Sequence, residues 1–174
     1  FPTNNTYNST LSQNFTANLT DNLGIKNATL FIYNQTGLFN QISVNFTNTL
    51  QSTVGIAVAL VNGVYDWWYQ VWDLTGSNFR PLANYTITID NVNPVIIITY
   101  PQNISYNIIP TTLNYTYLEI NPQNCWYSID GGITNTSITC KQNVTGLLAT
   151  QGPNTWMIRM NDNAANINQT YVTF

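Results

Sequence analysis

The chain has 174 residues, of which only 6% are charged, with four basic and seven acidic side chains and no histidine. This length suits one large domain or two domains of about 85 residues, and we favour two. The four basic residues are scattered at Lys26, Arg80, Lys141 and Arg159, a pattern that cannot neutralise a phosphate backbone and excludes nucleic acid as a partner.

Ala, Glu and Lys, which favour helices, are scarce, whereas Thr, Tyr, Val, Ile and Asn abound, and no long stretch has the 3.6-residue period of a helix. Turn residues such as those at Asn62-Gly63, Gly76-Ser77 and Asp130 to Gly132 separate short segments. In chain order, we predict strands at about 13–20, 27–33, 39–47, 53–60, 64–73, 83–90, 94–100, 112–119, 125–130, 133–139, 143–149, 154–161 and 167–174. The predicted fold class is all-β, and short strands at this spacing indicate β-sandwiches.

An internal repeat indicates two tandem copies of one module. The segment from Gly63 to Gly76 aligns with 152–165 at a constant offset of 89 residues, which pairs Trp67 with Trp156 and Asp73 with Asp162. We predict an extension at 1–12, a first sandwich at 13–91 and a second at 92–174, joined by a very short linker.

The matched residues of the repeat have expected roles. The two matched tryptophans face the same way as their apolar neighbours and are predicted to lie in the cores. The two matched aspartates end their strands just before small residues, where a carboxylate accepts hydrogen bonds from turn amides. A calcium site at these aspartates stays an alternative, although neither turn brings a second acid nearby.

Glycan acceptors are the most informative motif of the chain. Thirteen Asn-x-Ser/Thr triplets occur, where chance pairing of 28 Asn with 33 Ser and Thr would give about five. In eight of them the middle residue is apolar, so on a strand it faces the core while the acceptor faces solvent. The predicted acceptors are Asn4, Asn8, Asn14, Asn18, Asn27, Asn34, Asn45, Asn84, Asn103, Asn114, Asn135, Asn143 and Asn168.

Two cysteines, Cys125 and Cys140, enclose a turn at Gly131-Gly132, a spacing that a hairpin-spanning disulfide fits. A pair of reduced core thiols is the alternative. Because the glycan acceptors indicate an oxidising compartment, we expect the disulfide and an extracellular, cell-surface location. The first residue, Phe1, fits a mature chain after signal cleavage or a trimmed one.

The chain offers little material for catalysis. It has no histidine, a single glutamate and no phosphate loop or metal-ligand cluster, so we expect no enzyme, no metal site and no cofactor apart from covalent N-glycans. No apolar run approaches the roughly 18 residues of a membrane-spanning helix, so no transmembrane segment is expected.

Two features point to an interface. Trp68 and Trp72 face away from the predicted core of the first module, where the second module has Met157 and Asn161 at the matching positions. We expect these tryptophans to form an interface; coverage by the chain's own loops and a sugar-stacking site are the alternatives.

The other feature is the first module's missing leading strand. Its first predicted strand starts near Gln13, which leaves an uncovered edge that a strand from a neighbouring subunit would complete. Residues 1–12, whose apolar members are Phe1, Tyr7 and Leu11, are the candidate donor; a disordered glycosylated tail and pairing within the same chain are the alternatives.

Two resemblances follow from these residues. The repeated Trp-x-apolar-x-apolar-x-Asp-x-x-Gly/Ala ending, together with the segment from Cys125 to Gly132, resembles immunoglobulin-like modules of archaeal surface proteins. The cysteine pair departs from that of antibody domains, because its members lie close in sequence. In composition, the small, sequon-rich and charge-poor chain resembles the glycosylated thread pilins of archaea, which implies subunits joined by donor-strand exchange.

The expected function is therefore that of a structural subunit of an extracellular, heavily N-glycosylated filament or surface layer. Its expected partners are further copies of itself, assembled head to tail by strand donation. The alternative is an adhesin or carbohydrate-binding ectodomain that uses exposed tryptophans to bind surface glycans.

Overall fold

The computed structural model describes residues 1–174, with the exception of the Asn48 side chain. The chain is all-β and folds as two compact units, residues 1–91 (module one) and 92–174 (module two). Among the residues described there is no helix of the length and apolar character that a membrane crossing requires. Each module has its own hydrophobic core.

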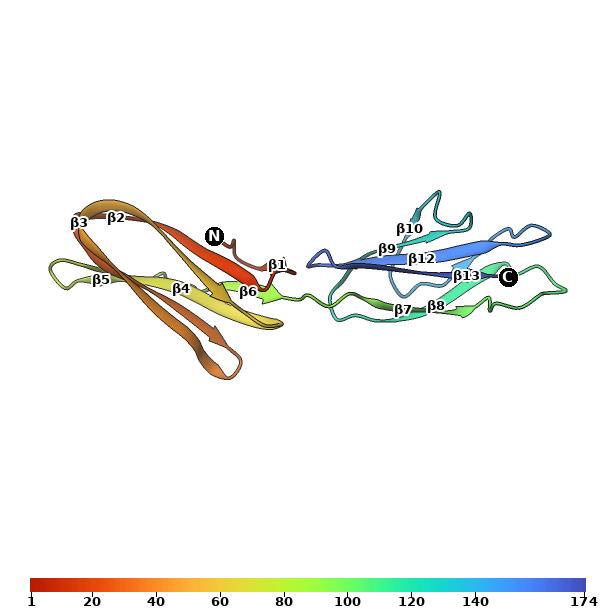
Figure 1. Cartoon of the computed structure of the whole chain (residues 1–174), viewed down its shortest axis with the longest axis horizontal. Helices are drawn as coiled ribbons and strands as arrows, with labels where there is room; N and C mark the ends of the chain where they lie inside the picture. Colours follow the sequence, from red (N-terminus) through yellow and green to blue (C-terminus); the bar gives the residue numbers. More distant parts are fainter. The chain divides into compact units, whose positions relative to one another are not determined.

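Module one contains six strands in a single hydrogen-bonded sheet of order β1-β6-β4-β2-β3, with β5 paired to β4. The strands are β1 (Thr6–Asn8), β2 (Ser12–Asn34), β3 (Gly37–Ala59), β4 (Gly63–Asp73), β5 (Asn78–Phe79) and β6 (Tyr85–Ile89). β2 and β3 run together through a bend, so that one half of the pair folds over the other strands (Figure 1).

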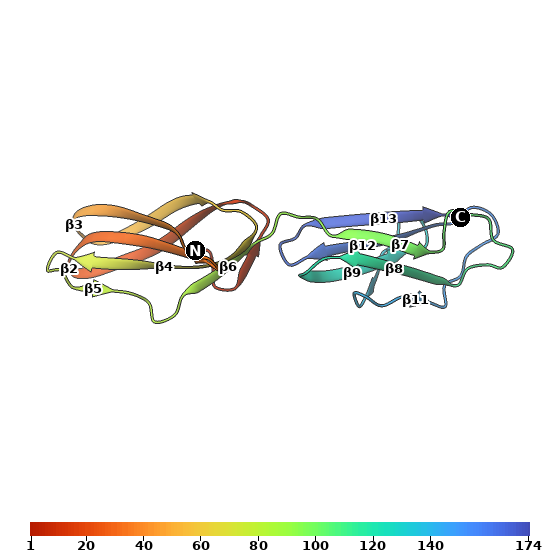
Figure 2. The same ribbon diagram turned by 90° about the horizontal axis from the view of Figure 1, so that it is seen from below.

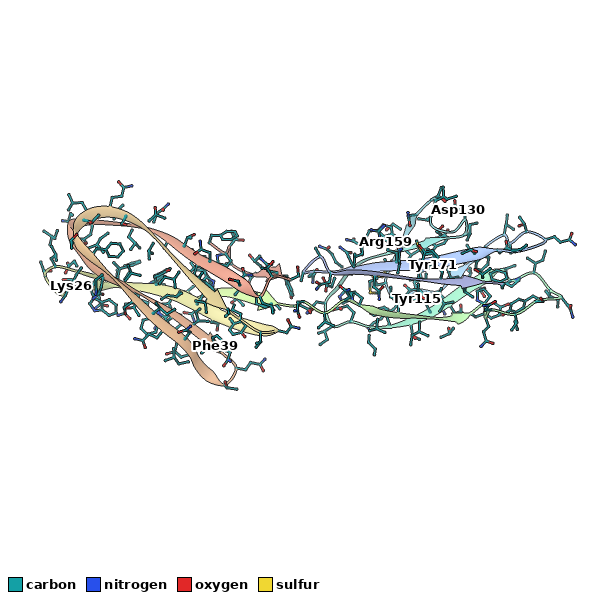
Figure 3. The ribbon with its side chains drawn as sticks, in the orientation of Figure 1. Lys26, Phe39, Tyr115, Asp130, Arg159 and Tyr171 are labelled. Atoms are coloured by element: carbon teal, nitrogen blue, oxygen red, sulfur yellow. A yellow bond between two sulfur atoms is a disulfide. The ribbon has the colours of Figure 1, made fainter. Side chains whose placement is uncertain are left out.

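The bend corrects the predicted strand boundaries. The four strands predicted between residues 13 and 60 are two long strands, β2 and β3, in the structure. The polar stretch after Thr20 forms a bulge within β2, where the prediction placed a break between two strands. Asp21 Oδ1 accepts hydrogen bonds from the amides of Leu23 and Gly24, both at 2.8 Å, and Gly24 has the positive φ of 108° that the bulge needs. Lys26 lies just beyond the bulge, at the bend (Figure 3).

Bending makes module one a sandwich. The first half of β2 and the second half of β3 form a two-stranded upper layer, and β1, β6, β4, β5 and the remaining halves form the lower layer. Phe15 from the upper layer meets Trp67 of β4 edge to face, with 5.0 Å between ring centroids. Trp67 is 3% exposed, as expected for a core residue.

Module two is a sandwich of two sheets, β10-β9-β12-β13 and β11-β8-β7 (Figure 2). Its strands are β7 (Val95–Tyr100), β8 (Thr112–Leu118), β9 (Pro122–Ser128), β10 (Thr136–Ile138), β11 (Val144–Thr145), β12 (Thr155–Asp162) and β13 (Ile167–Thr173). Trp156 is fully buried between the sheets and packs edge to face on Phe174, which confirms its predicted place in the core.

The disulfide between Cys125 and Cys140 is formed, with the two Cα atoms 5.3 Å apart. Cys125 is fully buried on β9, and Cys140 follows β10, so the bond fastens the β9–β10 hairpin to the core. The structure has no free cysteine, which excludes the alternative of two reduced thiols.

Candidate functional site

A groove opens in module one where its upper layer is too narrow to cover its lower layer. The upper layer has two strands, so β4 and the segment that follows it are left without a strand above them. The groove holds about 820 Å³. Its lining includes Ala17, Leu19, Trp67, Tyr69, Val71, Phe79 and Tyr85, with Phe1 and Pro2 at one end. An apolar floor beside an open strand edge is the geometry that accepts an extended segment.

The open edge belongs to the first half of β2. From Ser12 to Thr20 this strand pairs with β3 on one side. On the other side the described residues give it one backbone pair, in which Thr16 N–H donates to Phe1 O at 2.7 Å and Phe1 N donates to Thr16 O at 2.8 Å. Because alternate residues of a strand present their N–H and C=O groups to the same side, Asn18 and Thr20 present theirs to the same open edge.

The floor of the groove holds a buried polar atom without a partner. Trp67 Nε1 is buried and makes no hydrogen bond to any described residue. An orphaned donor of this kind costs free energy unless a further group satisfies it.

Nearby, the Tyr69 hydroxyl donates to Phe15 O at 2.8 Å and thereby ties the two layers together. Burial raises the pKa of the Tyr69 hydroxyl, so it stays a donor across the physiological range.

Residues 1–12 lie against their own module. β1 pairs in parallel with β6, Thr6 opposite Ile87, and Asn4 Oδ1 accepts a hydrogen bond from the amide of Thr86 at 2.8 Å. Further along, Leu11 O accepts one from Leu60 N–H. Of the three alternatives for this segment, the isolated chain adopts pairing within the same chain. Phe1 is nevertheless 65% exposed and Leu11 40% exposed.

The structure corrects the expected exposure of Trp68. This side chain is only 7% exposed, because it stacks on Phe31 and Tyr33 and the guanidinium of Arg80 lies 4.1 Å above its ring. The sequence favoured an interface, whereas Trp68 is covered by the chain's own residues. Trp72 is half-buried and still reaches the surface. A sugar-binding site that needs both tryptophans exposed therefore loses one of them.

The glycan acceptors all reach the surface. Of the thirteen acceptor asparagines, eight are exposed and five, Asn8, Asn27, Asn34, Asn84 and Asn114, are half-buried. Five of the eight apolar middle residues are buried as predicted: Phe15, Leu19, Ala28, Tyr115 and Val144. Tyr115 on β8 is marked in Figure 3.

Three apolar middle residues depart from the prediction. Phe46 is only partly buried against the core. Tyr85, the first residue of β6, is 42% exposed and stacks on Trp67 from the rim of the groove. Ile104, at 55% exposure, lies in the loop after β7 and outside any strand, so the period-two argument does not apply to it.

No family model matches the chain, and no curated protein matches it either. Among solved structures, the chain is similar to the fibronectin(III)-like modules of Clostridium thermocellum CbhA, with 14% identity and a TM-score of 0.48 over 99% of this chain and 89% of that one. It is also similar to a tetra-tandem repeat in the extending region of a large adhesion protein, with 12% identity and a TM-score of 0.44 over 94% and 49% of the two chains. A third similarity is to dimeric latent PorU from Porphyromonas gingivalis, with 13% identity and a TM-score of 0.38 over 96% and 18%.

Proposed function

We propose that this chain is a structural subunit of an extracellular, heavily N-glycosylated filament or surface layer, and that its copies join head to tail by β-strand donation into the groove of module one. The observation that carries the proposal is the open edge of β2 at Asn18 and Thr20 above an apolar floor. A donated strand would widen the upper layer to three strands and cover β4. Donation of this kind is a heterologous contact, which propagates into a polymer and does not close as a dimer.

The strand edge beside the groove already pairs with the start of the chain. Phe1 and Thr16 form one antiparallel pair with two backbone hydrogen bonds, and the next positions along the same edge are open. A neighbouring subunit that fills those positions gains main-chain hydrogen bonds and buries apolar surface at about 25 cal/mol per Å². An unpaired sheet edge is otherwise an aggregation hazard.

Residues 1–12 have the pattern that a donor strand requires. In an extended strand, odd and even positions face opposite ways. Phe1, Tyr7 and Leu11 hold odd positions, and the acceptors Asn4 and Asn8 hold even ones. A strand inserted with its odd positions toward Trp67 would bury the apolar side chains and keep both acceptors in solvent. Release of the three-residue β1–β6 pairing, together with the hydrogen bonds that Phe1, Asn4 and Leu11 make to their own module, would free the segment for this purpose.

The test uses two variants of one edge residue. Thr20→Pro removes the amide hydrogen that faces the open edge, which an edge strand tolerates because that hydrogen has no partner inside the module. Thr20→Ala keeps the amide hydrogen but removes the hydroxyl of the Asn18 acceptor triplet, so it controls for the lost glycan. We expect Thr20→Ala to polymerise like the wild type and Thr20→Pro to remain a folded monomer by negative-stain microscopy and circular dichroism.

A second measurement needs no substitution. The amide hydrogens of Asn18 and Thr20 should exchange rapidly in the monomer and slowly in assembled material, because only the donated strand gives them acceptors. Polymerisation of Thr20→Pro at the wild-type rate would contradict the proposal, as would rapid exchange of both amides in the polymer.

A further inference from the structure

One row of side chains crosses the outer face of module one, the face of the lower layer that points away from the core. Asn45 of β3 pairs with Asn27 of β2, and Asn27 pairs with Trp72 of β4. Their neighbours in sequence, Ala28, Val44 and Val71, pack in or against the core. Because side chains alternate along a strand, the three residues of the row point together toward the outside.

The two asparagines of this row are both glycan acceptors, and they compete for the same space. Directly paired residues on adjacent antiparallel strands have Cβ atoms about 5 Å apart. A sugar ring attached to one carboxamide therefore fills the space above the other. The row has room for one glycan.

Burial distinguishes the two acceptors. Asn45 and the hydroxyl-bearing Thr47 of its triplet are both exposed. Asn27 is half-buried, and its Oδ1 is buried without a hydrogen-bond partner among the described residues. Thr29, which completes the Asn27 triplet, is 4% exposed, and its hydroxyl lies 2.8 Å from that of Ser43. An acceptor triplet presents both its carboxamide and its hydroxyl, and of these two triplets only the one at Asn45 does so in the folded module.

Trp72 is the platform beside this acceptor. It is half-buried and lies one strand beyond Asn27, so a sugar on Asn45 that extends across Asn27 reaches the edge of its indole. Module two supports the association by contrast. There Asn161 stands in place of Trp72, and its strand neighbours Asn124 and Ile167 are not acceptors. The aromatic residue occurs where the acceptor occurs.

We propose that Asn45 carries an N-glycan, that Asn27 is bare, and that the first sugars on Asn45 lie across Asn27 against the ring of Trp72. This inference rests on the N-glycosylation in the proposed function and identifies one of its sites. In the attachment step, Nδ2 of Asn45 bonds to the anomeric carbon of a lipid-linked oligosaccharide, the lipid phosphate leaves, and the amide gives up one proton. Burial of the apolar face of the sugar on the indole then stabilises module one.

The first test is glycopeptide mass spectrometry of the native protein. We expect sugar on the peptide that contains Asn45 and none on the peptide that contains Asn27. Sugar on Asn27 would overturn the inference. An Asn45 without sugar, in a protein whose other acceptors carry sugar, would also overturn the inference. That result would leave the proposed function standing. Bare asparagines throughout would overturn this inference and the glycosylation in the proposed function together.

The second test is a double-mutant cycle on the glycosylated protein. Asn45→Gln should lower the melting temperature of module one by about 4 °C in the wild-type background and by much less in a Trp72→Ala background. Asn14→Gln is the matched control, because its strand partner is Ala57 and no aromatic side chain is opposite it; its effect should be the same in both backgrounds. An equal effect of Asn45→Gln in both backgrounds would show that the glycan does not contact Trp72.

Discussion

Asp73 of module one and Asp162 of module two cap the same turn. Asp73 N–H donates to Ser77 O at 3.0 Å, and Asp162 N–H donates to Asn166 O at 3.1 Å. The carboxylates then accept from the amide four residues on, each at 2.8 Å. Gly76 and Ala165, at the matching third positions, both have positive φ. The repeat seen in the sequence is therefore a structural repeat, and turn capping, the favoured role of both aspartates, is confirmed.

Loss of the second of these caps should be costly. Asp162 is fully buried, and its two oxygens accept from the backbone and the side-chain amide of Asn166. Asp162→Ala removes the acceptor of both hydrogen bonds and should lower the free energy of unfolding by about 2 kcal/mol. The loss should be smaller for Asp73→Ala, because Asp73 is nearer to solvent. Chemical denaturation of both variants measures the difference; equal losses would contradict the assignment.

The Tyr69 hydroxyl should hold the two layers of module one together. Tyr69→Phe keeps the ring in the core but removes the hydrogen bond to Phe15 O, 2.8 Å long in the structure. We expect a loss of about 1 kcal/mol in the free energy of unfolding. Tyr65→Phe removes a hydroxyl that bonds only within its own turn, to Val61 O at 3.0 Å, and is the matched control. If hydrogen exchange in β2 rises equally in both variants, the link between layers is not specific to Tyr69.

Asp130 should give module two a stabilisation that depends on pH. This residue lies in the loop after β9 (Figure 3), and hydrogen bonds from the Ser128 hydroxyl and from Thr134 lower the pKa of its carboxyl to about 2. The ordinary value is about 3.9. Because the folded state has the lower pKa, the stabilisation is complete above about pH 5 and is lost as the pH falls through about 4 toward 2.

The measurement compares melting temperatures of the wild type and Asp130→Asn from pH 7 to pH 2. The asparagine cannot titrate, so the advantage of the wild type should be constant down to about pH 5 and shrink as the pH approaches 2. A difference that does not change with pH would mean that the hydrogen-bonded carboxylate has its ordinary pKa.

The disulfide should stabilise module two alone. Cys125 and Cys140 are 15 residues apart, and a closed loop of that length contributes about 3 kcal/mol. In a Cys125→Ala/Cys140→Ala variant, amides of β9, β12 and β13 should lose protection from hydrogen exchange, while those of β2 and β4 keep it. Equal loss in both modules would show that the two units do not unfold independently.

The sequence predicts most of this fold because alternation is a local signal. Trp67, Trp156 and most of the apolar middle residues of the acceptor triplets lie where period-two alternation places them. The bend at Asp21 was not predicted, because side-chain hydrogen bonds to Leu23 and Gly24 convert an apparent turn into a bulge within one strand. The alternation of apolar and polar residues does not predict hydrogen bonds between a side chain and the backbone.

The candidate site was less predictable because it depends on pairs far apart in sequence. The sequence indicated an incomplete first module, but the groove depends on β2 folding back over β4. The coverage of Trp68 by Arg80 likewise joins a residue of β4 to one in the loop after β5. The parallel pairing of β1 with β6 brings together segments some 80 residues apart, which no local periodicity reports.

Donation of a strand from one subunit into the groove of the next would be visible by high-resolution electron microscopy of the native assembled material. We expect filaments or sheets in which an extended segment from a neighbouring copy runs along Asn18 and Thr20 and covers Trp67. Monodisperse particles that never polymerise, or a polymer whose grooves are empty or hold only the subunit's own Phe1, would contradict strand donation.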